Sequence, residues 1–271
     1  MKSRSVNSAA IFTLLIILAA AFLFPIVMVL INSFKGRFFI STEPFSLPTG
    51  ETFVGLENYI SGLQKTGFFN AFGYSLFITV FSVAAIVLFT SMAGWYITRV
   101  KSRFNKIMYM ALVFSMVVPF QMVMFSMSKI ANILSLDNPI GIIVIYLGFG
   151  AGLSTFMFCG FVKSIPVDIE EAAMIDGCGP IRTFFTVVFP VLRPTTVTVA
   201  ILNAMWIWND YLLPLLIIGR DYKTIPLVIQ YLKGGYGSID MGAMMAMLVL
   251  AIIPIVVFYL SAQKHIIKGA M

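Results

Sequence analysis

The chain has 271 residues, of which 60% are hydrophobic and only 11% are charged, and its mean hydropathy is +0.98. A soluble domain is about a quarter charged, so this chain has too little polar surface to cover a water-soluble fold. The net charge of +7 does not indicate nucleic-acid binding, because no basic stripe is interleaved with aromatic residues.

Six apolar runs are long enough to cross about 30 Å of hydrocarbon, and each is expected to be a helix because backbone groups must be satisfied internally there. In chain order they are residues 9–31, 74–97, 107–127, 140–162, 197–218 and 241–262. The first run follows Lys2 and Arg4, as in a signal peptide, but it exceeds the usual apolar length of about 7–15 residues. We therefore expect an uncleaved anchor and an all-α membrane protein with six transmembrane helices.

The distribution of Lys and Arg predicts the orientation. The loop at residues 99–106 has four basic residues and no acid, and short basic loops stay on the cytoplasmic side. With six spans, both termini are then cytoplasmic. Eleven of the 18 basic residues fall inside by this assignment, and seven, including Lys233, fall outside. The predicted location is a bacterial-type plasma membrane.

The predicted domains follow from the spans. Residues 1–70 form an N-terminal transmembrane helix with an extracellular loop, residues 71–262 form a five-helix core, and residues 263–271 form a short cytoplasmic tail. Four prolines lie within spans. Pro25 and Pro254 are expected to be tolerated, whereas Pro119 and Pro214 lie beside polar residues, which leaves a moving or cavity-lining role open.

The connection at residues 164–194 is the informative loop. Pro166 fits a helix start, and Asp168, Glu170 and Glu171 then fall near the positive end of that helix. Gly177 and the Gly179-Pro180 pair end it, and a second helical piece follows at residues 181–188. Ala172, Ala173, Ile175 and Phe184 give the hairpin an apolar face. That face either packs back on the bundle or docks a partner, and shape alone does not decide between the two.

The residue pattern of this loop resembles a family motif. Glu171-Ala172-Ala173, three residues, Gly177, nine residues, Val187, one residue, Phe189 and Pro190 resemble the EAA loop of ABC importer permeases. The family pattern is Glu-Ala-Ala, three residues, Gly, nine residues, Ile, any residue, Leu and Pro. Val187 and Phe189 replace the Ile and the Leu, and the spacing is intact.

Further segments resemble the MalG-type subunit of carbohydrate-uptake ABC transporters. They are Gly55-Leu56-Glu57-Asn58-Tyr59, Ala93-Gly94-Trp95-Tyr96, Pro119-Phe120-Gln121, Leu136-Asp137-Asn138, Trp208-Asn209-Asp210 and the tail at residues 263–269.

The resemblance implies an assembly with two permease subunits, two ATP-binding cassette ATPase subunits and an extracytoplasmic solute-binding protein. It implies that Glu171, Ala172, Ala173, Asp176, Gly177 and Pro190 couple the ATPase to the spans, and Glu170 is added by adjacency. The type I importer architecture is expected, with a sugar or oligosaccharide as cargo.

Polar residues within spans are candidates for a substrate path. Asn203, Trp206 and Asp210 have the spacing of one helix face, and Asn209 and Gln121 are added to them. An aromatic and polar face suits a sugar. The alternatives are a hydrogen bond or ion pair between helices, or a place near the membrane surface, and they remain open.

Other functions are weighed against this one. One alternative is the same machinery with a polyamine, peptide or phosphate-like solute as cargo, which residues alone do not exclude. A self-sufficient secondary transporter is disfavoured because no internal repeat is evident, and an intramembrane enzyme because no catalytic pair or zinc set lies in the spans. The chain has no P-loop motif, so ATP hydrolysis is expected on a separate subunit. Cys159, Cys178 and His265 lack metal-ligand spacing, and no metal or cofactor is expected.

Overall fold

The computed structural model describes residues 2–232 and 240–270, with side chains described from residue 9 to 261 within these ranges and at Gln263. Lys233, Met271 and the side chains of the predicted tail from residue 264 onward lie outside the described residues. The chain forms two compact units. Unit 1 comprises residues 1–69 and 228–254, and unit 2 comprises residues 70–227 and 255–271.

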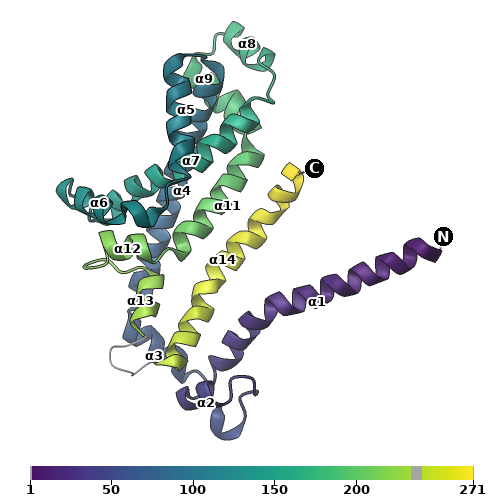
Figure 1. The fold of residues 1–271 in the computed structure, drawn as a ribbon, viewed down its shortest axis with the longest axis vertical. Coiled ribbons are helices and arrows are strands. Elements are labelled where there is room, and N and C mark those ends of the chain that lie inside the picture. Colours follow the sequence, from purple (N-terminus) through teal and green to yellow (C-terminus); the bar gives the residue numbers. More distant parts are fainter. Residues whose placement is uncertain (1, 233–239, 271) are drawn as a thin grey trace. The chain divides into compact units, whose positions relative to one another are not determined.

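Four helices are long and apolar enough to cross a membrane, and Figure 1 shows them within α1 (Lys2–Asn32), α4 (Phe68–Arg99), α7 (Pro139–Val162) and α14 (Met241–Ala270). They match the first, second, fourth and sixth predicted spans. Pro25 and Pro254 lie inside α1 and α14, which continue through them as expected. All regular elements of the described residues are helical, so the all-α prediction is confirmed.

The third and fifth predicted spans are not continuous helices. The third divides into α5 (Arg103–Ser115) and α6 (Phe120–Ile133), bent by 108°. Pro119 lies at the break, where it caps α6 in an extended conformation that a helix interior does not allow. The fifth ends early, because α11 (Arg193–Asn209) stops before α12 (Leu212–Ile217). Residues 180–191 and α11 form a second bent pair, with an angle of 78°, so the described residues give four spans, or up to six if each bent pair crosses once.

Unit 1 holds a small polar cluster after α1. The Lys35 side chain is fully buried, and its Nζ donates to the Glu43 carbonyl at 2.7 Å and to Ser46 Oγ at 3.1 Å. Asn58 Nδ2 donates to the carbonyls of Ser33 and Lys35, both at 2.8 Å. These bonds satisfy backbone groups that no helix pairs. They hold α2 (Arg37–Thr42), η1 (Gly50–Thr52) and α3 (Glu57–Thr66) as a folded segment rather than an open loop.

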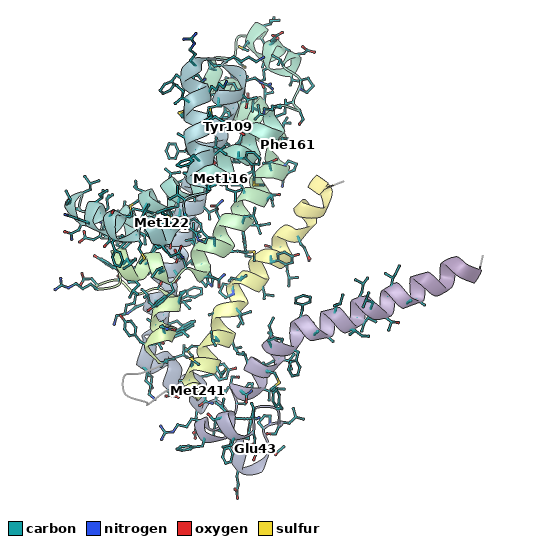
Figure 2. The ribbon with its side chains drawn as sticks, in the orientation of Figure 1. Glu43, Tyr109, Met116, Met122, Phe161 and Met241 are labelled. Atoms are coloured by element: carbon teal, nitrogen blue, oxygen red, sulfur yellow. The ribbon has the colours of Figure 1, made fainter. Side chains whose placement is uncertain are left out.

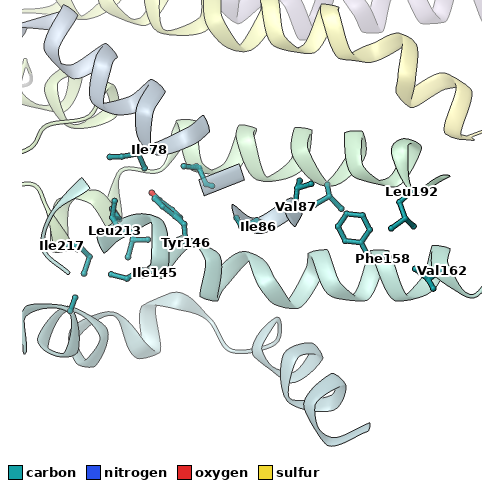
Figure 3. Packing of buried hydrophobic residues seen from close by; sticks show 14 of the residues in the cluster. Ile78, Ile86, Val87, Ile145, Tyr146, Phe158, Val162, Leu192, Leu213 and Ile217 are labelled. Atoms are coloured by element: carbon teal, nitrogen blue, oxygen red, sulfur yellow. The ribbon is translucent and has the colours of Figure 1, made fainter. Parts of the chain in front are cut away.

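The core of unit 2 forms where α7 packs against α5 and α11. Figure 3 shows Ile86 and Val87 from α4 beside Phe158 and Leu192, all of them buried. Gly152 of α7 allows the close packing of α7 against α5. A Cβ on Gly152 would lie 2.6 Å from the Leu112 carbonyl oxygen, so α5 approaches α7 at backbone distance. Close packing of small residues is the usual way in which helices associate in lipid.

Candidate functional site

The informative loop folds as predicted into a helix with an acidic first turn, α8 (Asp168–Ile175). Gly177 has φ +84°, which suits glycine because a Cβ is strained there. The amide of Gly177 donates to the Met174 carbonyl, and the amide of Cys178 donates to the Ala173 carbonyl, both at 3.0 Å. This pair of bonds is a Schellman motif, which satisfies the last carbonyls of the helix. The acidic first turn, the glycine end and the reason for that glycine are confirmed, but the helix begins at Asp168, so Pro166 lies two residues before its first residue.

One surface of α8 is open to the outside of the chain. Glu171, Ala172, Asp176 and Gly177 are exposed, and Ala173 is half-buried. Ile175 is 86% exposed, which leaves a large apolar side chain without cover inside this subunit. The sequence analysis expected Phe184 on this surface, but Phe184 does not lie there. Its side chain is fully buried in the core of unit 2, because α9 (Pro180–Thr183) turns the chain back toward α4.

The Glu170 side chain faces α4 and not the exposed surface of α8. This side chain is 3% exposed, and its carboxylate accepts from Arg99 Nη2 at 2.7 Å, from Arg99 Nε at 2.9 Å and from Trp95 Nε1 at 2.8 Å. Arg99 Nη2 also donates to the Ile165 carbonyl at 2.9 Å. Glu170 therefore ties α8 to the end of α4 and is closed to a partner protein. The sequence interpretation missed Arg99 and Trp95 as its partners. Their spacing of four residues places them on one face of α4, but nothing in the sequence connects that face with residue 170.

A π-helical turn, η2 (Phe184–Val188), follows α9 and leads into α10 (Phe189–Val191). The Phe189 amide donates to the carbonyl of Phe184, five residues back. Pro190 comes next and is exposed. Because proline has no amide hydrogen, it cannot donate the backbone hydrogen bond of a regular α-helix. The Phe184 ring packs 5.5 Å from Trp95 and 5.8 Å from Phe189. The Glu170 contact and this aromatic cluster thus meet at Trp95.

The path candidates separate into buried and exposed groups. Asn203 is buried, and its Nδ2 donates to Ser154 Oγ at 3.1 Å and to the Val199 carbonyl at 2.9 Å. That contact is a hydrogen bond between α11 and α7, as the structural alternative proposed. Trp206 is 41% exposed, and Asn209 and Gln121 are also exposed. The Asn209 side chain donates to the Met205 carbonyl at 2.7 Å within its own helix.

Asp210 does not lie on the α11 face as predicted, because α11 ends at Asn209 and Asp210 is extended. Its Oδ1 accepts from the amides of Leu212 at 3.0 Å and Leu213 at 3.3 Å, which are the first two residues of α12. Its Oδ2 accepts from Tyr146 Oη at 3.0 Å. The Tyr146 ring lies edge-on to Trp206, with ring centroids 5.4 Å apart. Aromatic rings and a carboxylate thus gather where α11 breaks.

Comparison with known proteins decides the family. The family described as "Binding-protein-dependent transport system inner membrane component" matches residues 86–270, which is more than half of the chain and includes α8. The chain belongs to this family. The matched range includes the loop between α7 and α11, whose spacing resembles the EAA pattern.

Several curated relatives match nearly the whole of this inner membrane component. A probable permease for starch degradation products from Thermoanaerobacterium thermosulfurigenes is 38% identical over 94% of this chain and 92% of its own. A multiple sugar-binding transport system permease from Streptococcus mutans is 36% identical over 99% and 97%. A melibiose, raffinose and stachyose import permease from Bacillus subtilis is 30% identical over the same shares.

The fold is also found in solved structures. A chain of a bacterial ABC transporter for import of the acidic polysaccharide alginate superposes with a TM-score of 0.80, at 22% identity, over 97% of this chain and 98% of that one. A chain of the alginate transporter in complex with a periplasmic protein bound to an alginate pentasaccharide gives 0.69 at 16% identity, over 96% and 93%. At this identity the likeness establishes the fold of the inner membrane component and no more.

Proposed function

We propose that this chain is the membrane permease subunit of an ATP-driven, binding-protein-dependent importer for a sugar or oligosaccharide. The observation that carries the proposal is α8, which exposes Glu171, Ala172 and Ile175 while Glu170 on the same helix is tied to Arg99 of α4. A helix that is exposed on one side and bonded to a span on the other can contact a partner and transmit the partner's movement to that span.

The partner that fits the open side of α8 is an ATPase subunit, one of two in the assembly, with a second permease completing the path. The coupling surface consists of Glu171, Ala172, Ala173, Asp176 and Gly177, and Pro190 follows on the same loop. Glu170 is assigned a positioning role, because its buried carboxylate contacts α4 and not the surface. The ATP is hydrolysed on the separate subunit, and an extracytoplasmic solute-binding protein delivers the cargo.

The cargo class is supported by two separate features. Relatives that align over nearly the whole chain are described as permeases for starch degradation products and for melibiose, raffinose and stachyose. The exposed Trp206 beside Tyr146 and Asp210 also offers an aromatic face with a polar group, which suits a sugar ring and its hydroxyls. Trp206 is the side chain we assign to substrate contact, while Asn203 holds helices together.

Reconstitution tests this function. The complete complex in proteoliposomes should take up labelled malto-oligosaccharides or α-galactosides only with ATP and the binding protein. The Glu171→Ala variant should lose ATP-driven uptake while still inserting into membranes, with Glu51→Ala, exposed in unit 1, as the control. Uptake by the two permeases without any ATPase would overturn the proposal. Uptake of a polyamine or peptide in place of sugars would keep the machinery and replace the cargo.

The proposed orientation places both termini and α8 in the cytoplasm. Cys178 lies next to α8 and is partly exposed, whereas Cys159 is buried. A membrane-impermeant thiol reagent should therefore label Cys178 in inside-out vesicles only. An Arg220→Cys variant, in which Cys178 is replaced by Ser, should give the opposite result, because Arg220 is exposed in a loop assigned to the outside.

A further inference from the structure

A basic cavity lies where α4 turns into α5. Its volume is about 480 Å³. Four cations line it, Lys101, Arg103, Lys106 and Lys163, and the described residues that line it include no Asp or Glu. All four side chains are exposed. Such a set of uniform charge around a hollow attracts an anion more strongly than scattered charges do.

Two side-chain hydrogen bonds hold the turn that carries three of these cations. Ser102 caps α5, and its Oγ accepts from the Asn105 amide at 3.1 Å. The Asn105 side chain is buried and donates to the Val100 carbonyl at 2.6 Å. These two bonds join the end of α4 to the first turn of α5. The fourth cation, Lys163, comes from the end of α7, which packs directly against α5.

The cations are not used elsewhere in the described part of the chain. The ion pairs among the described residues are Lys65 with Asp240 and Arg99 with Glu170. Arg99 immediately precedes the turn, and its guanidinium is committed to α8. The positive charge at the cavity is therefore available for a ligand from outside this subunit.

An apolar stripe runs along α5 from the same turn. Phe104, Ile107, Met110 and Phe114 are 71%, 67%, 60% and 67% exposed and recur at the helical period. Tyr109 belongs to the cavity lining itself, and Figure 2 shows it on α5 at the end of unit 2 that also carries Phe161. A basic hollow beside an exposed apolar stripe has the two parts of a phospholipid site, one for the headgroup and one for acyl chains.

We propose that this cavity binds the headgroup phosphate of an anionic phospholipid, with its acyl chains along the stripe of Phe104, Ile107, Met110 and Phe114. Basic pockets beside transmembrane helices are suited to such headgroups. A soluble phosphate would use the cations but not the stripe, and an acidic protein segment would leave those apolar side chains uncovered. The proposal does not depend on the cargo, and the proposed orientation determines only that the lipid belongs to the cytoplasmic leaflet.

Native mass spectrometry of the assembled, delipidated complex tests this site. Phosphatidylglycerol, phosphatidylcholine and inorganic phosphate are titrated separately. We expect each copy of this chain to retain phosphatidylglycerol in preference to phosphatidylcholine. The Arg103→Gln/Lys106→Gln variant should bind phosphatidylglycerol roughly tenfold more weakly. The control is Lys129→Gln/Arg220→Gln, which removes two exposed cations that do not line the cavity and should bind like the parent protein.

Each other outcome overturns the proposal. Equal weakening in both double variants would mean general attraction to the basic protein. Displacement of phosphatidylglycerol by millimolar inorganic phosphate would mean a site for a soluble anion. Loss of ATPase subunits with lipid retention unchanged would mean an acidic protein surface as the ligand. If Arg103→Gln/Lys106→Gln does not assemble, Lys101→Gln/Lys163→Gln removes the same charge from the other sides of the cavity and decides the question.

Discussion

Glu170 and Arg99 are 71 residues apart in the sequence, yet their side chains form two hydrogen bonds of 2.7 and 2.9 Å. The Glu170 side chain is 3% exposed and the Arg99 side chain is 17% exposed, so little solvent screens the pair. Trp95 donates to the second carboxylate oxygen at 2.8 Å. This relationship ties α8 to α4, and under the proposed function it lets a movement of α8 reach the span.

Removing one member of this pair should be costly, because the other is left buried and charged. We expect Glu170→Ala to lower the free energy of unfolding in detergent by about 3 kcal/mol. Glu171→Ala, one residue later and exposed, should change it by less than about 0.5 kcal/mol. In a double-mutant cycle, Arg99→Ala and Glu170→Ala together should cost at least ~1 kcal/mol less than the sum of the two. Additive costs would mean that the pair does not join the helices.

Gly177 should be sensitive for a conformational reason alone. A Cβ there would meet no atom within 4 Å, but the φ of +84° is unfavourable for an L residue. We expect Gly177→Ala to cost about 1 kcal/mol and to reduce ATP-driven uptake, because the end of α8 shifts. Gly179→Ala is the matched control, since Gly179 has an ordinary φ of −70° and equally open surroundings. Equal uptake by the two variants would contradict a role for the Gly177 turn.

Variants of two neighbouring tryptophans, Trp206 and Trp208, can distinguish substrate contact from packing. Trp206 is 41% exposed, while Trp208 is 6% exposed and packs 5.9 Å from the Phe72 ring. We expect Trp206→Ala to reduce oligosaccharide uptake severalfold while costing under about 1.5 kcal/mol of stability, the value of its contact with Tyr146. Trp208→Ala should instead cost about 3 kcal/mol or more. Thermal unfolding and uptake assays on both variants distinguish the roles, and normal uptake by Trp206→Ala would remove it from the path.

The approach of α5 to α7 can be tested with two glycines of α7. A Cβ on Gly152 would lie 2.6 Å from the Leu112 carbonyl oxygen, which is backbone and has little room to move. We expect Gly152→Ala to destabilise the protein by about 1–3 kcal/mol. Gly148→Ala meets nothing within 4 Å, and it should be neutral or stabilising by up to about 1 kcal/mol because alanine favours helix. Unfolding in detergent measures both, and equal effects would argue against backbone-close packing.

Unit 1 should show a pH dependence at Asp240, which lies just outside α14. Burial alone raises the pKa of Asp240, but the hydrogen bonds from Lys65 and the Ala243 amide, with the charges of Lys65 and Arg37, outweigh burial and lower the pKa. The carboxylate is therefore favoured in the folded state. Its contribution is present above the ordinary value of 3.8 and is lost as pH falls through the lowered pKa.

The size of this effect is at most about 1 kcal/mol, since the Lys65 side chain is 55% exposed and solvent screens the pair. Unfolding between pH 5 and pH 3, a range of about two units around the ordinary carboxyl pKa, measures it. Asp240→Asn should remove that share of the acid sensitivity, whereas Glu51→Gln, which forms none of the described ion pairs, should leave it unchanged. Identical acid profiles for the parent protein and Asp240→Asn would rule out the pair as a source of stability.

The sequence by itself determined the membrane class, the four continuous spans and the glycine end of α8. These features depend on local composition: apolar length fixes a helix in lipid, and Gly177 ends α8 whatever surrounds it. The spacing around Glu171 also identified the family that comparison then confirmed. Each of these signals is contained in a short stretch of chain.

Only the tertiary structure decided which way the functional side chains face. Glu170 and Glu171 are adjacent and chemically alike, but Arg99 and Trp95 bury one and leave the other exposed. Asp210 left the predicted α11 face because the helix ends one residue earlier, where its carboxylate bonds the next turn and Tyr146. The basic cavity likewise needed Lys163 beside Arg103. Burial and charge pairing depend on residues far apart in the chain, so the spacing of residues within a short stretch cannot predict them.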